Sequence, residues 1–154
     1  MAYANSIQAP SYRLPVEEIF IVDDDVDLCE VITWSLEAEG YRVRTFGSGE
    51  TALRSLLEFR PPLIILDFHL GDMDGQEFLK RKRELDCTSP VIIVSGSPDE
   101  VLGNAPRVDY ASLVEKPLDL PRLLREIGKL NVPCSPKSSN EASTQPSHGP
   151  AFAG

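Results

Sequence analysis

The sequence predicts an α/β fold in which helices cover both faces of a doubly wound parallel sheet, giving three layers. Between residues 17 and 130, five short apolar runs, often rich in Ile and Val, alternate with helical patterns. Short continuous apolar runs are typical of buried parallel strands, and consecutive parallel strands need a crossover helix. Right-handed crossovers then place helices on both faces of the sheet. With 154 residues, 42% of them hydrophobic, the chain can bury the core of one domain.

The predicted strands are short, and most of the segments between them carry apolar stripes at helical spacing. The strands are residues 19–22, 41–46, 63–66, 91–94 and 112–115. The stripes are Leu28, Val31, Ile32 and Leu36, then Leu53, Leu56 and Leu57, then Phe78, Leu79 and Leu85, and finally Leu120, Leu123, Leu124 and Ile127. Gly40 is expected to stop the first helix and Asp119 to cap the last. Any fourth helix should be short, because Gly103, Asn104 and Pro106 should end it within about two turns.

The ends of the chain and its composition restrict the class of protein. Residues 1–16 are interpreted as a flexible leader, and residues 131–154, rich in Pro and Ser without apolar periodicity, as a disordered tail. The net charge is −9, with −10 carried by residues 17–130 and +1 by Arg13 of the leader, and this acidity argues against a general nucleic-acid binder. Three scattered cysteines indicate neither a disulfide framework nor a zinc site. Since the sequence shows neither an apolar span of roughly 18 residues nor a signal peptide, we expect no membrane contact and a cytoplasmic location.

Polar or charged residues follow four of the five predicted strands. They are Asp23, Asp24 and Asp25 after the first strand, Asp67 after the third, Ser95 after the fourth and Lys116 after the fifth. In a doubly wound sheet the ligand site lies beyond the carboxyl ends of the strands. Carboxylates gathered there form an oxygen-rich pocket that suits Mg²⁺. A carboxylate can also act as a nucleophile toward a phosphoryl group, whose developing charge needs a cation, an ammonium group and a hydroxyl donor.

Four motifs in this order carry a resemblance to a known family. They are IFIVDDD, LIILDFHLGDMDG, PVIIVSGS and EKP. Together they resemble the receiver domain of two-component response regulators, the phosphoacceptor partners of sensor histidine kinases. The resemblance covers about residues 17–130 and implies a flavodoxin-like (βα)5 fold with strand order 2-1-3-4-5.

The resemblance also implies the metal ligands. Asp23 and Asp24 would hold Mg²⁺, Asp24 directly and Asp23 through water. Asp67 and the backbone carbonyl of His69 would complete the protein ligands. Asp25 and Asp27 are instead expected at the start of the first helix, where the helix dipole favours acidic side chains.

The phosphoryl chemistry would fall to three residues. By resemblance, Asp67 would accept the phosphoryl group from a histidine kinase or a histidine phosphotransferase. Ser95 would hydrogen-bond a phosphoryl oxygen, and Lys116 would pair with the phosphate and with Asp67. The peptide between Lys116 and Pro117 is often cis in this family.

The sequence departs from the family pattern at three places. Gly71 stands where proline is common, which should loosen the loop after Asp67. Leu113 stands where an aromatic switch residue is usual, which puts its coupling to Ser95 in doubt. The short fourth helix indicates a remodelled output face.

Other conspicuous residues have simpler interpretations. The basic run at residues 80–83 is interpreted as a solvated helix face rather than a nucleic-acid patch. Trp34 lies at the edge of the first apolar stripe, where packing is favoured over a partner surface. Asp72 and Asp74 are expected to be loop and turn carboxylates.

The favoured hypothesis is a stand-alone receiver that catalyses only its own phosphorylation and dephosphorylation. Its output would reach a downstream protein target, without a DNA-binding domain, and homodimer formation stays open. A phosphatase of the haloacid-dehalogenase type is disfavoured, because Asp27 breaks its first motif and the acceptor aspartate follows the third strand. A degenerate receiver acting as a constitutive interaction module is disfavoured by the intact set of acidic, hydroxyl and lysine residues.

Overall fold

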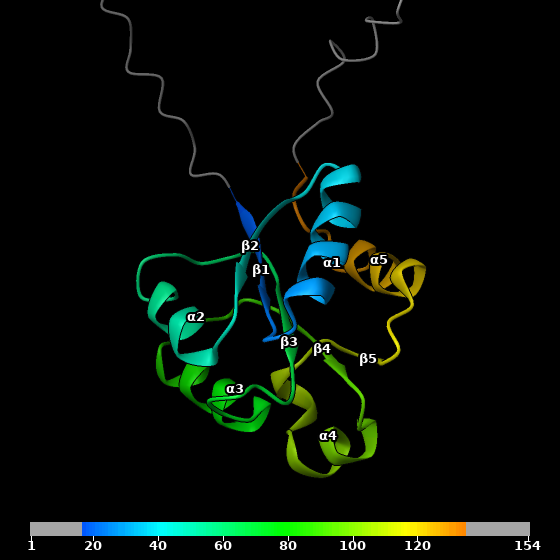
Figure 1. Ribbon diagram of the computed structural model, residues 1–154. Helices are drawn as coiled ribbons and strands as arrows, with labels where there is room; N and C mark the ends of the chain where they lie inside the picture. The colour runs from blue at the N-terminus through cyan, green and yellow to red at the C-terminus, as the bar shows by residue number, and fades with distance from the viewer. Residues whose placement is uncertain (1–16, 135–154) are drawn as a thin grey trace, which may run out of the picture.

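The computed structural model describes residues 17–134, in which two layers of helices enclose a five-stranded sheet (Figure 1). The neighbouring strands are parallel and follow the order β2-β1-β3-β4-β5, which confirms the predicted fold. The predicted leader and the predicted tail from residue 135 onward lie outside the described residues.

The strands and helices alternate along the chain as the apolar pattern predicted. The strands are β1 (Glu18–Val22), β2 (Arg42–Phe46), β3 (Ile64–Asp67), β4 (Val91–Ser95) and β5 (Ser112–Glu115). The helices are α1 (Val26–Ala38), α2 (Gly49–Ser55), α3 (Gly75–Glu84), α4 (Pro98–Asn104) and α5 (Leu120–Gly128), with a 3₁₀ turn at Arg107–Asp109. Among residues 17–134, none of these helices has the length and apolar composition that crossing a bilayer requires.

Helices α1 and α5 cover one face of the sheet. Successive strand residues point to opposite faces, so Ile19 and Ile21 of β1 pack on this side while Phe20 and Val22 pack on the other. The core on this side continues to Val132, which is 8% exposed and lies two residues beyond the predicted end of the domain.

The buried line of α1 differs from the predicted stripe. Cys29, Ile32 and Leu36 are buried, whereas Val31 is 41% exposed and Trp34 is 65% exposed. The prediction that favoured packing for Trp34 is therefore wrong for most of its side chain. The helix is rotated so that the small Cys29 side chain, close to the carbonyl of Asp23, lies against the sheet.

Helices α2, α3 and α4 cover the opposite face. Phe78 and Leu79 of α3 are buried with Leu53 of α2 and Val101 of α4. Leu57 is 65% exposed, contrary to the predicted stripe, because α2 ends at Ser55 and the following turn carries Leu57 outward. The fourth helix is short as predicted, since α4 ends at Asn104.

Side-chain caps define where several helices begin. Asp25 accepts a hydrogen bond from the Leu28 amide at 3.1 Å at the start of α1, and Asp119 accepts one from the Arg122 amide at the start of α5. Both predicted helix-starting roles are confirmed. Gly40 follows α1 with a φ of 94°, a conformation that glycine adopts without steric cost.

The basic run at residues 80–83 is not solvated along its whole length. Lys82 is 6% exposed, and its Nζ donates to the Cys87 carbonyl at 2.9 Å. Burial lowers the pKa of Lys82. The solvated-face prediction is therefore wrong at Lys82, whose position on α3 turns it toward the α3–β4 loop while Lys80 and Arg83 stay exposed.

Candidate functional site

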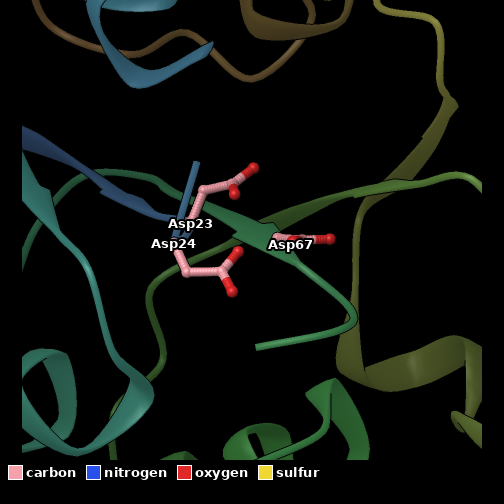
Figure 2. Close-up of side chains that lie close together, drawn as sticks. All are labelled: Asp23, Asp24 and Asp67. Atoms are coloured by element: carbon pink, nitrogen blue, oxygen red, sulfur yellow. The ribbon is translucent and has the colours of Figure 1, made fainter. Parts of the chain in front are cut away.

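The carboxyl edge of the sheet brings together an acidic cluster from two neighbouring strands. Asp23 follows β1 and Asp67 ends β3, and the two strands pair with Val22 opposite Leu66. Asp23, Asp24 and Asp67 each offer a carboxylate oxygen within 4.8 Å of the others. Figure 2 shows the three side chains side by side at the ends of these strands. Three carboxylates at this separation repel one another unless positive charge neutralises them.

Asp23 and Asp67 are the buried members of the acidic cluster, and Asp23 is the more deeply buried of the two. The Asp23 side chain is 4% exposed, Oδ1 accepts from the Asp25 amide at 2.9 Å, and Oδ2 accepts from Lys116 Nζ at 3.4 Å. Burial raises the pKa of Asp23, the Asp67 charge adds to this effect, and the Asp25 amide and Lys116 act against it. The charged form of Asp23 is therefore held at a cost in free energy.

Asp24 contributes an open carboxylate. Its side chain is exposed, and within residues 17–134 it takes part in no hydrogen bond or ion pair. Both oxygens of Asp23 are already engaged by protein donors. Asp24 is thus the member of the acidic cluster with both oxygens free to coordinate a cation directly.

Lys116 brings a positive charge to the acidic cluster. Its Nζ lies 3.4 Å from Asp23 Oδ2 and 3.5 Å from Asp67 Oδ1. Burial acts to lower the pKa of Lys116, but the charges of Asp23 and Asp67 outweigh it and raise the pKa. The Lys116 amide also donates to the Ser95 carbonyl at 2.8 Å, and the peptide before Pro117 is cis, as the resemblance implied.

Ser95 ends β4 beside β3, the strand that ends at Asp67. The residue is fully buried, and its hydroxyl oxygen accepts from the Ser97 amide at 3.0 Å. A hydroxyl that accepts one hydrogen bond keeps its own proton to donate. Leu113, at the position of the missing aromatic switch, is partly buried against the core formed by α2, α3 and α4.

The loop between β3 and α3 presents the backbone of His69 to the acidic cluster. The His69 amide donates to Asp67 Oδ1 at 3.3 Å, and His69 forms an isolated antiparallel bridge with Asp74. The bridge is closed by hydrogen bonds from Leu70 to Met73 and from Gly75 to Phe68.

This pattern fixes the direction of the His69 carbonyl. In such a non-hydrogen-bonded pair, the N–H and C=O groups of His69 both point away from Asp74. Because the His69 N–H faces the Asp67 carboxylate, its carbonyl lies on the same side of the loop. Within the described residues that carbonyl oxygen accepts no hydrogen bond.

Two contacts near the site were not predicted from the sequence. The His69 side chain lies 3.1 Å from Glu100 of α4, with both side chains about half exposed. Asp72 of the β3–α3 loop accepts hydrogen bonds from the Gly49 and Glu50 amides at the start of α2. Sequence patterns report neighbours on one element, whereas these contacts join elements that are distant in sequence.

Comparison with known proteins identifies the family. The family model of the response regulator receiver domain matches residues 19–128. The probable transcriptional regulatory protein TcrX of Mycobacterium tuberculosis is 31% identical over 122 residues, 74% of this chain and 52% of that protein. The DNA-binding response regulator MtrA of the same species is 34% identical over 85 residues, 55% of this chain and 37% of that protein. The chain thus spans about half, or less, of the length of these curated relatives.

Solved structures share the same fold. A CheY-like receiver domain protein from Methanospirillum hungatei superimposes with a TM-score of 0.65 and 27% identity, covering 75% of this chain and 94% of that one. The receiver domain of a sensor histidine kinase from Pseudomonas aeruginosa, solved with a magnesium ion in its active-site cleft, gives a TM-score of 0.68 and 25% identity over 74% of this chain and 96% of its own. By its family match, its strand order and its relatives, this chain belongs to the response regulator receiver family.

Proposed function

We propose that Asp67 of this receiver domain accepts a phosphoryl group from a histidine kinase or a histidine phosphotransferase in a Mg²⁺-dependent reaction. The observation that carries the proposal is the position of Asp67, within 4.8 Å of the Asp23 and Asp24 carboxylates and 3.5 Å from Lys116. Receiver domains are phosphoacceptors that bind Mg²⁺ through acidic residues and interact with histidine kinases or phosphotransferases.

The residues at the carboxyl edge fit a Mg²⁺ ion. Mg²⁺ prefers hard oxygen ligands and keeps several waters, so it needs only a few protein ligands. Asp24, Asp67 and the His69 carbonyl supply oxygens that are open to direct coordination, while Asp23 acts through water because its oxygens already have partners. When bound, the ion neutralises charge on the carboxylates and on the incoming phosphoryl oxygens.

The proposed transfer is a displacement at phosphorus. An Asp67 carboxylate oxygen attacks the phosphorus of a phosphohistidine, a new P–O bond forms, and the P–N bond breaks with departure of the imidazole. The Lys116 ammonium and the Ser95 hydroxyl each donate to a phosphoryl oxygen, where negative charge concentrates.

The consequence that we propose is a change in protein contacts. The Ser95 hydroxyl also accepts from the Ser97 amide at the start of α4, so a movement of Ser95 toward the phosphoryl oxygen would alter this contact. The domain would catalyse only its own phosphorylation and dephosphorylation. Acidic residues outnumber basic ones 24 to 15, which favours a protein target or a second copy of the chain over direct contact with nucleic acid.

Intact-mass measurement after incubation with Mg²⁺ and acetyl phosphate tests the acceptor. The expected result is a gain of one phosphoryl group that is lost in Asp67→Asn and kept in Asp86→Asn, a matched change of charge at an exposed turn residue. A gain that survives Asp67→Asn would refute the assignment of Asp67. No gain in the wild-type protein with several phosphodonors would favour a receiver that acts without phosphorylation.

A further inference from the structure

We propose that Asp72 is a positioning residue, which fixes the β3–α3 loop on the start of α2 and so presents the His69 carbonyl to Mg²⁺. This role rests on the proposed function, because it concerns the same metal site. From the sequence, Asp72 was expected to be an ordinary loop carboxylate with no role in positioning the loop.

The Asp72 carboxylate makes a two-point attachment to α2. Its Oδ1 accepts from the Gly49 amide at 3.0 Å, and its Oδ2 accepts from the Glu50 amide at 2.9 Å. These amides belong to the first turn of α2 and have no partner within the helix. Although burial acts to raise it, the pKa of Asp72 is lowered, because the hydrogen bonds from Glu50 and Gly49 outweigh burial.

Packing reinforces this attachment. A Cβ on Gly49 would lie 2.6 Å from Met73 Sδ, so the Met73 side chain sits directly on the start of α2. Arg81 of α3 pairs with Glu50 at 2.7 Å, although both side chains are substantially exposed and the pair contributes little stability. The loop therefore contacts α2 through one polar residue and one apolar residue that are adjacent in sequence.

The attachment is transmitted to His69 through a short stretch of backbone. Leu70 donates to the Met73 carbonyl at 3.2 Å, which closes a tight turn containing Gly71 and Asp72. Glycine has the freest backbone of any residue, so the turn gains no stiffness from Gly71. Where other receivers commonly carry a proline, this chain holds the turn from outside, through the Asp72 side chain.

A metal-free measurement tests the attachment itself. Asp72→Asn keeps the size of the side chain but turns an NH2 donor toward one of the two amides. We expect amide hydrogen exchange at Gly49, Glu50 and Leu70 to accelerate at least about tenfold in Asp72→Asn, and not in the control Asp86→Asn. Asp86 has a φ of 53°, which asparagine tolerates. Unchanged exchange at these amides would overturn the proposal.

Mg²⁺ binding tests the positioning role. By calorimetry, Asp72→Asn should raise the Mg²⁺ dissociation constant by about tenfold, as is typical of groups that orient metal ligands. At saturating Mg²⁺, its phosphorylation rate should match that of the wild type, because no reacting atom has changed. Faster exchange with an unchanged Mg²⁺ dissociation constant would make Asp72 merely structural and overturn the inference.

Failure of the underlying function would look different. A wild-type protein that binds no Mg²⁺ would refute the metal site and the inference together, whatever Asp72→Asn does. If the wild-type protein binds Mg²⁺ with the same dissociation constant as Asp72→Asn, the inference about Asp72 is refuted. The proposed acceptor site at Asp67 is not affected by that result.

Discussion

The ammonium group of Lys116 lies 3.5 Å from Oδ1 of Asp67, so the proposed acceptor carboxylate has a cationic partner within the protein itself. The same ammonium lies 3.4 Å from Asp23. Lys116 and the proposed Mg²⁺ ion would therefore compete to neutralise the same carboxylates. We therefore expect Lys116 to weaken the binding of Mg²⁺ and to promote the proposed phosphoryl transfer.

Replacing Lys116 by glutamine should separate these effects. Without the ammonium charge, Mg²⁺ should bind roughly tenfold more tightly, corresponding to about 1.4 kcal/mol of electrostatic free energy. The Mg²⁺-saturated phosphorylation rate should fall by about 10²-fold, since a donor to the phosphoryl oxygens is lost. Calorimetry and an acetyl phosphate time course measure the two quantities. Equal Mg²⁺ affinity in both proteins would contradict the competition.

Asp23→Asn should stabilise the metal-free protein at neutral pH. The pKa of Asp23 is raised in the folded state, chiefly by burial. The contribution of this carboxyl group to stability is therefore fully present below the unfolded pKa near 3.8 and is lost as pH rises through the folded pKa. At pH 7 the charged carboxylate is thus destabilising, and its removal should add about 1 kcal/mol to the free energy of unfolding. Urea denaturation at pH 7 measures this gain.

Asp24→Asn is the matched control for that measurement. Asp24 belongs to the same cluster but is exposed, so its replacement should change the stability less than Asp23→Asn does. Added Mg²⁺ should raise the free energy of unfolding of the wild type more than that of Asp23→Asn. The difference in stability between the two proteins should therefore become smaller. A loss of stability in metal-free Asp23→Asn would show that its hydrogen bonds outweigh the cost of its burial.

Two glycine substitutions should change stability in opposite directions. A Cβ on Gly75 would lie 2.4 Å from Phe68 Cδ2, and Phe68 is 2% exposed, so Gly75→Ala should cost about 1–3 kcal/mol. Gly103 of α4 has nothing within 4 Å of its Cβ position, so Gly103→Ala should add about 0.5–1 kcal/mol. Thermal or urea denaturation of both variants checks the pair. Destabilisation by Gly103→Ala would indicate that α4 needs the flexibility of glycine.

Lys82 should give the wild type a distinct alkaline dependence of stability. Because burial lowers its folded pKa, the unfolded chain binds the proton more tightly, and the stability contribution of Lys82 rises with pH between the folded pKa and the unfolded value near 10.5. Lys82→Met removes this dependence and the hydrogen bond to the Cys87 carbonyl, which is worth about 1 kcal/mol. Urea denaturation at pH 7 and pH 9.5 should show the wild type gaining relative to Lys82→Met. If the difference in the free energy of unfolding between the wild type and Lys82→Met is the same at both pH values, this result would contradict the buried position of Lys82.

The sheet and the gathering of the acidic cluster were predictable from local pattern. Five apolar runs separated by helical segments leave few arrangements open, and parallel strands bring their carboxyl ends to one edge. Asp23 and Asp67 could therefore be placed together although 44 positions separate them. Caps such as Asp25 and Asp119 were predictable because their partners lie three residues away.

The remaining features depend on tertiary contacts that a pattern does not encode. Which line of α1 faces the sheet is decided by packing, so the exposure of Trp34 escaped prediction. Lys82 lies in a basic run, and its buried ammonium group donates to the carbonyl of Cys87 in the next loop, a contact that the run does not indicate. Asp72 meets the amides of Gly49 and Glu50 across the α2–α3 layer, and these residues lie at least 22 positions from it in the chain, so no local pattern reports the contact.

Trp34 is the only tryptophan of the chain, and it lines a groove between α1 and β2 together with Asp23 and Cys29. Its indole emission is therefore an intrinsic optical signal from the surface of α1. A protein that covers α1 should shift this emission to shorter wavelength, whereas a small phosphodonor confined to the carboxyl edge of the sheet should not. Trp34 fluorescence should thus distinguish the binding of a partner at α1 from the proposed phosphorylation of Asp67.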